Sequence, residues 1–215
     1  MSIISIGMDR KMNFNMYFNM NFDMYFIMNY KMNYDTALYI NFNNGGTAMN
    51  IILIGMSGAG KSTLGVLLAK ALGMGYVDTD IIIQQHQGKL LQEIIDNEGI
   101  DRFLQIEEEI VSALDLQDCV IATGGSVVYS EEAMNALRQM GPVFYLHVPY
   151  EEIERRLTNI TTRGIVIKKG KSLRDVYEER VPLYIKYCDK VIDCSAMDIE
   201  ACVDEIVQVA ASYRQ

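Results

Sequence analysis

The chain has 215 residues, half of them hydrophobic, which suits one domain with a normal buried core and leaves room for a small second one. Its net charge of −9 argues against nucleic acid or an anionic membrane as the main partner, so a bound nucleotide would need a local cationic site. The 4 cysteines contain no CxxC pair, the 2 histidines add too little for a zinc site, and no apolar run approaches the roughly 18 residues that span a bilayer. We therefore expect a cytoplasmic protein, a monomer without nucleic-acid or membrane partners.

The first 48 residues differ in composition from the rest of the chain. Between residues 8 and 35 a methionine recurs every four residues, and from Met12 onward an aromatic residue lies two positions after each of them. A period of four does not match an α-helix, the frequent asparagines do not suit a signal peptide, and such low-complexity sequence rarely builds a core. We expect residues 1–48 to be a disordered extension or a mis-assigned start, with an AT-rich DNA repeat translated upstream of a true start at Met49.

From residue 49 onward, short apolar runs alternate with segments of helical periodicity. Strands are expected at 51–54, 76–78, 119–122, 143–148 and 191–193. Helices are expected at 61–72, 81–114 with breaks near Gly88 and Gly99, 131–140, 149–157, 172–187 and from 198 onward. The basic stretch 158–171 is interpreted as a mobile loop. This alternation predicts a three-layer α/β domain, in which a five-stranded parallel sheet carries helices on both faces and its strands end at one edge.

Residues 55–63 read GMSGAGKST and satisfy the phosphate-loop pattern G-x-x-x-x-G-K-[ST] between a predicted strand and a predicted helix. Such a loop turns backbone N–H groups toward phosphate oxygens, and the helix that follows adds its positive N-terminal end. We expect Lys61 to reach the β- and γ-phosphates and Ser62 to ligate Mg²⁺. The expected nucleotide-binding residues of the loop are Gly58, Ala59, Gly60, Lys61, Ser62 and Thr63. The alternative is a glycine-rich turn that binds no nucleotide.

Two carboxylates follow the second predicted strand, in the sequence VDTD at residues 77–80. Asp78 is a candidate Mg²⁺ ligand, directly or through water, and Asp80 is a candidate acceptor of the proton from an attacking hydroxyl. The alternative is structural, because either Thr79 or Asp80 could cap a helix. Their position beside the phosphate loop favours the catalytic interpretation.

Taken in order, the motifs of residues 49–215 resemble the shikimate kinase family. The motifs are GxxGxGKST, DTD, GIDRFLQIEEE at 99–109, ATGGS at 122–126, TTR at 161–163 and ERVPLY at 179–184. The resemblance implies a P-loop kinase fold with a mobile lid, and the ATP- and Mg²⁺-dependent phosphorylation of shikimate to shikimate 3-phosphate in aromatic amino-acid biosynthesis. The hydroxylated acceptor would be a small molecule.

The same resemblance implies a role for each matching residue. Asp80 would bind and help deprotonate the acceptor hydroxyl, Arg180 would pair with a substrate carboxylate, Arg163 in the lid would approach the transferring phosphate, and Arg156 would lie against the adenine. The expected catalytic residues are Lys61, Asp80 and Arg163. The expected acceptor-binding residues are Asp80, Gly124, Gly125, Ser126 and Arg180, where the two glycines would supply backbone N–H groups.

The sequence departs from the family pattern at three places, all outside the phosphate loop. Leu104 stands where the family has an arginine that clamps the substrate carboxylate, and Arg102 lies on nearly the opposite face of the helix. Glu107, which would brace that arginine, has lost this partner. Ser126 replaces the third glycine of a GGG run, and Gly164 follows Arg163 where the family has proline.

These departures leave two alternatives to shikimate phosphorylation open. The acceptor of the kinase could be another small hydroxy acid or a polyol. The chain could also be a nucleotide-binding pseudo-kinase that acts as a regulator, although intact Lys61, Ser62, Asp78 and Asp80 weigh against it because a pure binder needs no base.

Overall fold

The structure is a computed structural model that describes residues 49–157, 166–167, 170–195 and 197–213. Residues 1–48, and Arg163 and Gly164 in the expected lid, therefore lie outside the described ranges. In chain order the elements are β1 (Ile51–Ile54), α1 (Lys61–Leu72), β2 (Gly75–Asp78), α2 (Thr79–Gln87), α3 (Leu91–Glu98), α4 (Ile100–Ser112), β3 (Cys119–Ala122), η1 (Val127–Tyr129), α5 (Glu131–Met140), β4 (Val143–His147), α6 (Tyr150–Leu157), α7 (Leu173–Tyr187), β5 (Lys190–Asp193) and α8 (Ile199–Ala211).

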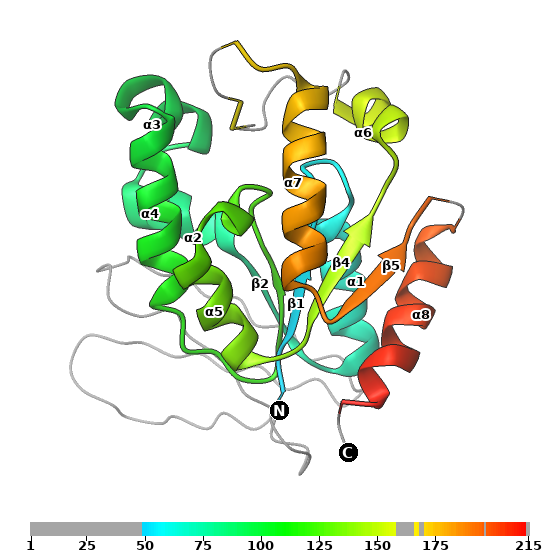
Figure 1. The fold of residues 1–215 in the computed structure, drawn as a ribbon. Coiled ribbons are helices and arrows are strands. Elements are labelled where there is room, and N and C mark those ends of the chain that lie inside the picture. Colours follow the sequence, from blue (N-terminus) through cyan, green and yellow to red (C-terminus); the bar gives the residue numbers. More distant parts are fainter. Residues whose placement is uncertain (1–48, 158–165, 168–169, 196, 214–215) are drawn as a thin grey trace, which may run out of the picture. The chain divides into compact units, whose positions relative to one another are not determined.

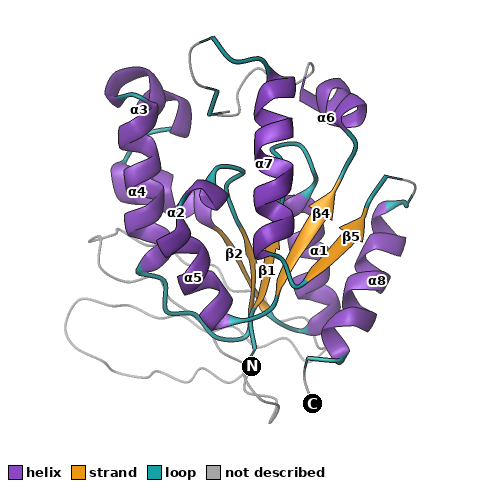
Figure 2. Ribbon diagram, viewed as in Figure 1, coloured by secondary structure: helices purple, strands orange, loops and turns teal. Residues whose placement is uncertain are grey.

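A five-stranded parallel sheet with the strand order β2-β3-β1-β4-β5 forms the centre of the domain. Helices α1 and α8 pack against each other on one face of the sheet, and α5 and α7 cover the other face (Figures 1 and 2). The predicted three-layer α/β architecture and its five parallel strands are confirmed.

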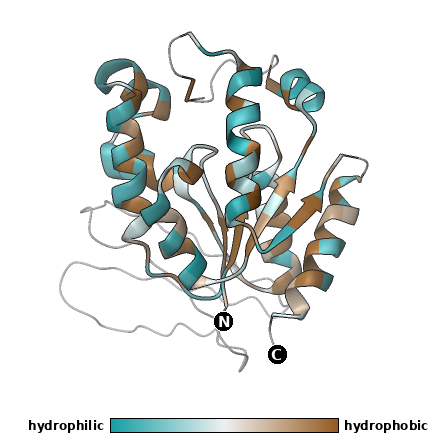
Figure 3. Ribbon diagram, in the orientation of Figure 1, coloured by the Kyte–Doolittle hydropathy of each residue, from teal (hydrophilic) through white to brown (hydrophobic). Residues whose placement is uncertain are grey.

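Burial explains this arrangement. All four residues of β1 are fully buried, as expected for the central strand of a parallel sheet that is covered on both faces. The strands are largely hydrophobic, whereas most helices carry both hydrophobic and hydrophilic residues (Figure 3). Within the described ranges, none of the helices combines the length and hydrophobicity that crossing a membrane requires.

The breaks expected near Gly88 and Gly99 are confirmed, and one short element was not expected. The helical region expected at 81–114 consists of three helices, α2, α3 and α4, which are separated at Gly88 and Gly99 with φ of 62° and 86°. The short helix η1 was not expected, because three residues are too few to show a helical period.

Strand register places three chain segments at one edge of the sheet. Leu53 of β1 and Asp78 of β2 both pair with Ala122 of β3, so these neighbouring strands end at the same level. The phosphate loop, the Asp78–Asp80 segment and the Gly124–Gly125 turn directly follow those strand ends. Ligands of open parallel sheets bind at this edge, so the fold brings the three motifs into one site.

Candidate active site

The phosphate loop has the backbone that an anion cradle needs. Gly58 and Gly60 have φ of 85° and 100°, a region that only glycine enters readily, and Gly60 directly precedes α1. The first residue of that helix, Lys61, is 7% exposed, and its Nζ donates hydrogen bonds to the carbonyl oxygens of Gly55 at 2.7 Å and Met56 at 2.9 Å. The ammonium is thus held by the loop in which phosphates would bind.

Tyr76 connects the two residues that the sequence predicts as metal ligands. Its hydroxyl donates to Oδ2 of Asp78 at 3.0 Å and also hydrogen-bonds the side chain of Ser62. Burial and the neighbouring Asp78 carboxylate raise the pKa of Tyr76, so it stays a neutral hydrogen-bonding group. The ring lies directly over α1, where a Cβ on Gly65 would come within 2.6 Å of Tyr76 Cε2.

The donor set around Ser62 and Asp78 fits Mg²⁺ bound to a nucleotide. Mg²⁺ prefers oxygen ligands and usually keeps several waters, with one or two protein ligands and substrate phosphates completing its shell. In the described part of the chain, no three His, Cys, Asp or Glu side chains gather as an all-protein metal site would require. A hydroxyl from Ser62 and a carboxylate from Asp78 beside a phosphate loop are the smaller set that Mg²⁺ needs.

Asp78 also has a structural role, which differs from the capping alternative considered for the sequence. Asp78 itself is the N-cap of α2, and its Oδ1 accepts a hydrogen bond from the backbone N–H of Asp80 at 3.0 Å. The cap is therefore neither Thr79 nor Asp80. Because the neighbouring residue provides the cap, the side chain of Asp80 is not needed for this purpose.

The Gly124–Gly125 turn lies against Asp80 from β2–α2 and against Glu107 from α4. A Cβ on Gly124 would overlap Oε1 of Glu107 and lie 3.0 Å from Oδ1 of Asp80, so both carboxyl groups approach the same glycine. The backbone N–H of Gly124 donates to Oγ1 of Thr79 at 3.1 Å. The expected binding of the acceptor by this N–H stays a prediction, since the N–H already has Thr79 as a partner within the protein.

Arg180 reaches the same turn from α7. It is 1% exposed, and it donates from Nε to the Tyr129 hydroxyl at 3.2 Å and from Nη2 to the Val166 carbonyl at 2.9 Å. Its Nη1 would lie 3.2 Å from a Cβ on Gly125. Arg180 thus brings a guanidinium group to this edge of the sheet, beside the Gly124–Gly125 turn.

The two unusual side chains of the sequence lie together beside Glu107. Leu104, Glu107, Ser126 and Tyr129 are among the residues that line a small pocket of about 140 Å³ between α4 and η1. The Ser126 side chain hydrogen-bonds the Glu107 carboxyl, which gives Glu107 a partner that the sequence did not reveal. Arg102 is elsewhere, paired with Glu109 at 3.1 Å, and so does not replace the missing arginine.

Among the remaining predicted residues, the structure places Arg156, Ala59 and Thr63. Arg156 of α6 donates from Nη1 to the Gly58 carbonyl at 3.1 Å and from Nε to Glu152 at 2.7 Å, which places it against the phosphate loop. Ala59 is buried, Thr63 is exposed, and Arg163 lies outside the described residues.

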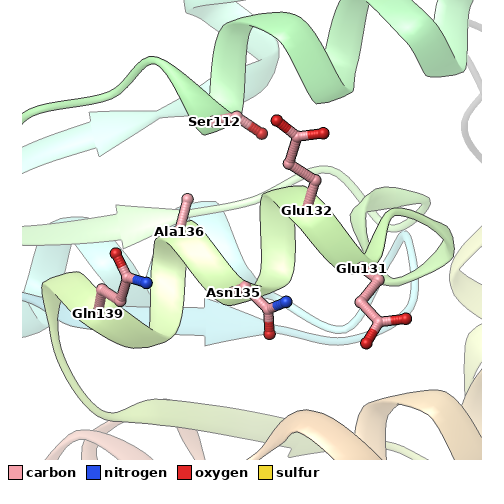
Figure 4. A pocket seen from close by; sticks show the side chains of 6 residues that line it. All are labelled: Ser112, Glu131, Glu132, Asn135, Ala136 and Gln139. Atoms are coloured by element: carbon pink, nitrogen blue, oxygen red, sulfur yellow. The ribbon is translucent and has the colours of Figure 1, made fainter.

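A larger hollow of about 440 Å³ lies along α5, away from these motifs (Figure 4). It is lined by Ser112, Glu131, Glu132, Asn135, Ala136 and Gln139. All of these side chains except that of Ala136 are polar or acidic, and none of them belongs to the phosphate or acceptor motifs. We place the candidate functional site at the sheet edge, where charged groups from β2, α1, α2, α4, α6 and α7 converge.

Sequence reasoning missed three residues of this site. Tyr76, Tyr129 and Tyr184 each use a hydroxyl there, and Tyr184 donates to the Gly125 carbonyl at 2.6 Å. Tyr184 lies inside the ERVPLY motif, so the motif itself was a signal. Tyr76 and Tyr129 had no such signal, because a tyrosine in an apolar segment is normally interpreted as a residue of the hydrophobic core.

Comparison with known proteins identifies the family. A family model described as shikimate kinase matches residues 57–211. The chain belongs to the shikimate kinase family. The resemblance expected from the sequence motifs is thereby confirmed, and with it membership in a family of ATP-dependent kinases.

Individual shikimate kinases align over most of the kinase domain. The chain is 36% identical over 162 residues to shikimate kinase of Thermodesulfovibrio yellowstonii, covering 74% of this chain and 93% of the relative. It is 41% identical over 140 residues to shikimate kinase of Nostoc punctiforme, covering 63% of this chain and 76% of the relative. Shikimate kinase from Acinetobacter baumannii, solved in complex with shikimate, superposes with a TM-score of 0.72 at 30% identity, covering 79% of this chain and 96% of that one.

Proposed function

We propose that this shikimate kinase family member transfers the γ-phosphoryl group of ATP to a hydroxyl of shikimate, forming shikimate 3-phosphate and ADP in aromatic amino-acid biosynthesis. The observation that carries the proposal is the convergence of Lys61, Asp80 and the buried Arg180 at one edge of the sheet. The relative from A. baumannii was solved with shikimate bound, which supports this acceptor.

In this reaction the acceptor oxygen attacks the γ-phosphorus, the bond from that phosphorus to the β,γ-bridging oxygen breaks, and ADP leaves. The proton of the attacking hydroxyl passes to the Asp80 carboxylate. Lys61 and the N–H groups from Gly58 to Thr63 stabilise the negative charge on the phosphates. Arg180 holds the acceptor carboxylate, while Gly124, Gly125 and Ser126 form the wall against which its ring lies. Catalysis then rests on positioning and charge.

Mg²⁺ would be held by the Ser62 hydroxyl, by phosphate oxygens and, directly or through water, by Asp78. When bound, it neutralises charge on the β- and γ-phosphates. Tyr76 keeps Ser62 and Asp78 close together before the nucleotide arrives. Arg156 would lie against the adenine and Arg163 would approach the transferring phosphate when the lid closes and excludes water.

A second acceptor class has one observation in its favour. Leu104 puts an apolar side chain in the pocket where the family pattern has an arginine, which suits a small hydroxy acid or polyol with its acid group placed elsewhere. The third candidate, a pseudo-kinase regulator, is disfavoured because Asp80 is present and is not needed as a helix cap.

The decisive experiment is a coupled ADP-release assay with ATP, Mg²⁺ and a panel of hydroxylated acceptors. Turnover of shikimate at ordinary concentrations supports the proposal. Turnover of another acceptor, with none on shikimate, supports the second class. ATP binding without turnover of any acceptor supports the pseudo-kinase regulator.

Leu104→Arg gives a companion test. For a shikimate kinase, the added guanidinium should tighten shikimate binding or leave it unharmed, because Glu107 is close enough in α4 to pair with it. Loss of activity would instead indicate a pocket reshaped for another acceptor.

We further propose that the protein acts as a cytoplasmic monomer without nucleic-acid or membrane partners. The domain boundary at Met49 stays a prediction, as does the assignment of residues 1–48 to a low-complexity extension or a mis-assigned start. The intact mass of the natural protein tests both, since a mass that includes residues 1–48 excludes a start at Met49.

A further inference from the structure

Glu107 is an unusual group for a protein interior. Its side chain is on α4, the residue is 2% exposed, and its Oε1 is fully buried without a hydrogen-bond partner among the described residues. A buried carboxylate without full pairing is costly, so such a group tends to keep its proton. Glu107 also has no assigned step in the proposed reaction.

The position of Glu107 relates it directly to the acceptor. Its Oε1 contacts Gly124, which also contacts Asp80, while the next residue, Gly125, lies against Arg180. One two-residue turn therefore brings together the proposed base, the proposed carboxylate-binding cation and an additional carboxyl group. An acceptor carboxylate beside Arg180 would lie close to Glu107.

Several charged groups act on Glu107 from the surrounding elements. Burial raises its pKa to about 7, and the Asp80 carboxylate on α2 adds to this rise. The Ser126 hydrogen bond, Arg180 on α7 and Lys61 on α1 oppose it, and Tyr184 on α7 also interacts with Glu107. Within α4, Glu108 is engaged with Ser130 at 2.5 Å. The proton of Glu107 is therefore exchangeable near neutral pH.

The missing arginine at position 104 makes this proton important. An arginine there would neutralise Glu107, whereas Leu104 brings no charge. If Glu107 ionises, it adds a second carboxylate beside Asp80 and competes with an anionic acceptor for Arg180, and like charges repel strongly in a buried site. If Glu107 stays neutral, Arg180 is available to the acceptor.

We propose that Glu107 is a protonation-dependent positioning residue of the acceptor site, whose neutral form admits an anionic acceptor beside Arg180 and whose ionised form repels it. The inference rests on the proposed phosphorylation of shikimate. It concerns the acceptor only, because the nucleotide phosphates bind at Lys61 and the phosphate loop.

The test is the pH dependence of the KM for shikimate at saturating Mg²⁺ and ATP. If only the protonated form binds, a group titrating near 7 raises this KM roughly tenfold between pH 6 and pH 8, in proportion to the loss of the competent form. The KM for ATP should not show this rise, nor should the KM for the uncharged methyl ester of shikimate if it is phosphorylated.

Glu107→Gln keeps the size and the neutral hydrogen-bonding group, so its KM for shikimate should stay low and flat over the same range. Glu108→Gln, one position along α4, is the matched control and should keep the tenfold rise. Ser126→Ala removes a hydrogen bond that favours the ionised form, so it should move the rise to higher pH, and it serves if Glu107→Gln does not fold.

The outcomes separate the two proposals. Two results would overturn the inference while leaving the proposed function intact. One is shikimate turnover by the unsubstituted protein with a KM for shikimate that does not change with pH. The other is an unchanged rise of this KM in Glu107→Gln. Absence of shikimate turnover at every pH overturns the proposed function, and the inference with it. If the KM for shikimate rises with pH, and if Glu107→Gln abolishes this rise while Glu108→Gln keeps it, both the proposed function and the inference are supported.

Discussion

The phenolic hydroxyl of Tyr76 donates a hydrogen bond to the Asp78 carboxylate at 3.0 Å and also hydrogen-bonds Ser62. One tyrosine thus connects the end of β2 to the first turn of α1. Both partners are proposed to hold Mg²⁺, so Tyr76 fixes the spacing of the metal site in advance.

Tyr76→Phe should therefore weaken the binding of Mg²⁺–nucleotide while leaving the fold intact. A hydrogen bond to a carboxylate contributes roughly 1.5 to 3 kcal/mol, so we expect a loss of about tenfold or more in affinity. Calorimetric titration of Mg²⁺–ADP measures it. Tyr177→Phe, which removes a hydroxyl bonded to the Val148 carbonyl at 3.1 Å, is the control and should bind normally. Equal affinities for both variants would contradict the role of Tyr76.

Lys61→Met should abolish most of the turnover, because the ammonium held by the loop is the group proposed to reach the phosphates. Loss of one such charge-stabilising donor typically lowers kcat by about 10² to 10³. Steady-state ADP release measures this change. Lys70→Met replaces an exposed lysine of the same helix and should leave kcat unchanged.

Arg180→Lys should raise the KM for shikimate by roughly ten- to a hundredfold, because a lysine ammonium cannot reproduce the planar set of contacts to Tyr129, Val166 and the acceptor. The KM for ATP should change little. Arg174→Lys lies on the same helix, where Arg174 packs over the Tyr150 ring, and provides the control. A KM for shikimate that is unchanged in Arg180→Lys would exclude Arg180 from the acceptor site.

Gly124→Ala should destabilise the protein by roughly 1 to 3 kcal/mol, because the added methyl group overlaps Oε1 of Glu107 in a close-packed region. Urea unfolding measures the change. Adding Glu107→Ala to Gly124→Ala makes room for the added methyl group. The double variant should therefore lose less stability than the sum of the two single changes. Simple additivity would show that the two residues do not contact.

The stability of the protein should fall as pH rises between about 4.5 and 7 because of Glu107. Its pKa is about 7 in the folded protein and 4.5 for the unperturbed group, so the folded state binds more protons in this window. The contribution is complete below pH 4.5, is lost as pH rises through 7, and amounts to up to about 3 kcal/mol. Urea unfolding at pH 4.5 to 8 measures the free energy of unfolding, which should depend less on pH in Glu107→Gln.

Carboxylates with a lowered pKa, such as Glu152 with a pKa of about 2, affect stability only below this pH window. Equal slopes in both proteins would place the Glu107 pKa near its ordinary value.

The sequence by itself determined the nucleotide half of this protein. The run IILI and the loop GMSGAGKST specify a buried strand, a left-handed glycine backbone and a helix start, all of which depend on residues adjacent in the chain. The alternation of apolar runs and helical segments was enough for five parallel strands and the common edge where they end. The order of the motifs along the chain was enough to identify the family.

Only the tertiary structure decided the contacts of the proposed acceptor half. Glu107 and Ser126 come from segments separated by β3, and the sequence showed them as two unrelated departures, whereas folding joins them by a hydrogen bond beside Leu104. The N–H of Gly124 is taken by Thr79, which is 45 residues away in the chain. Such contacts depend on register and helix packing, which no local pattern encodes. The phosphate loop is defined by local backbone geometry, whereas the acceptor site is defined by long-range side-chain contacts.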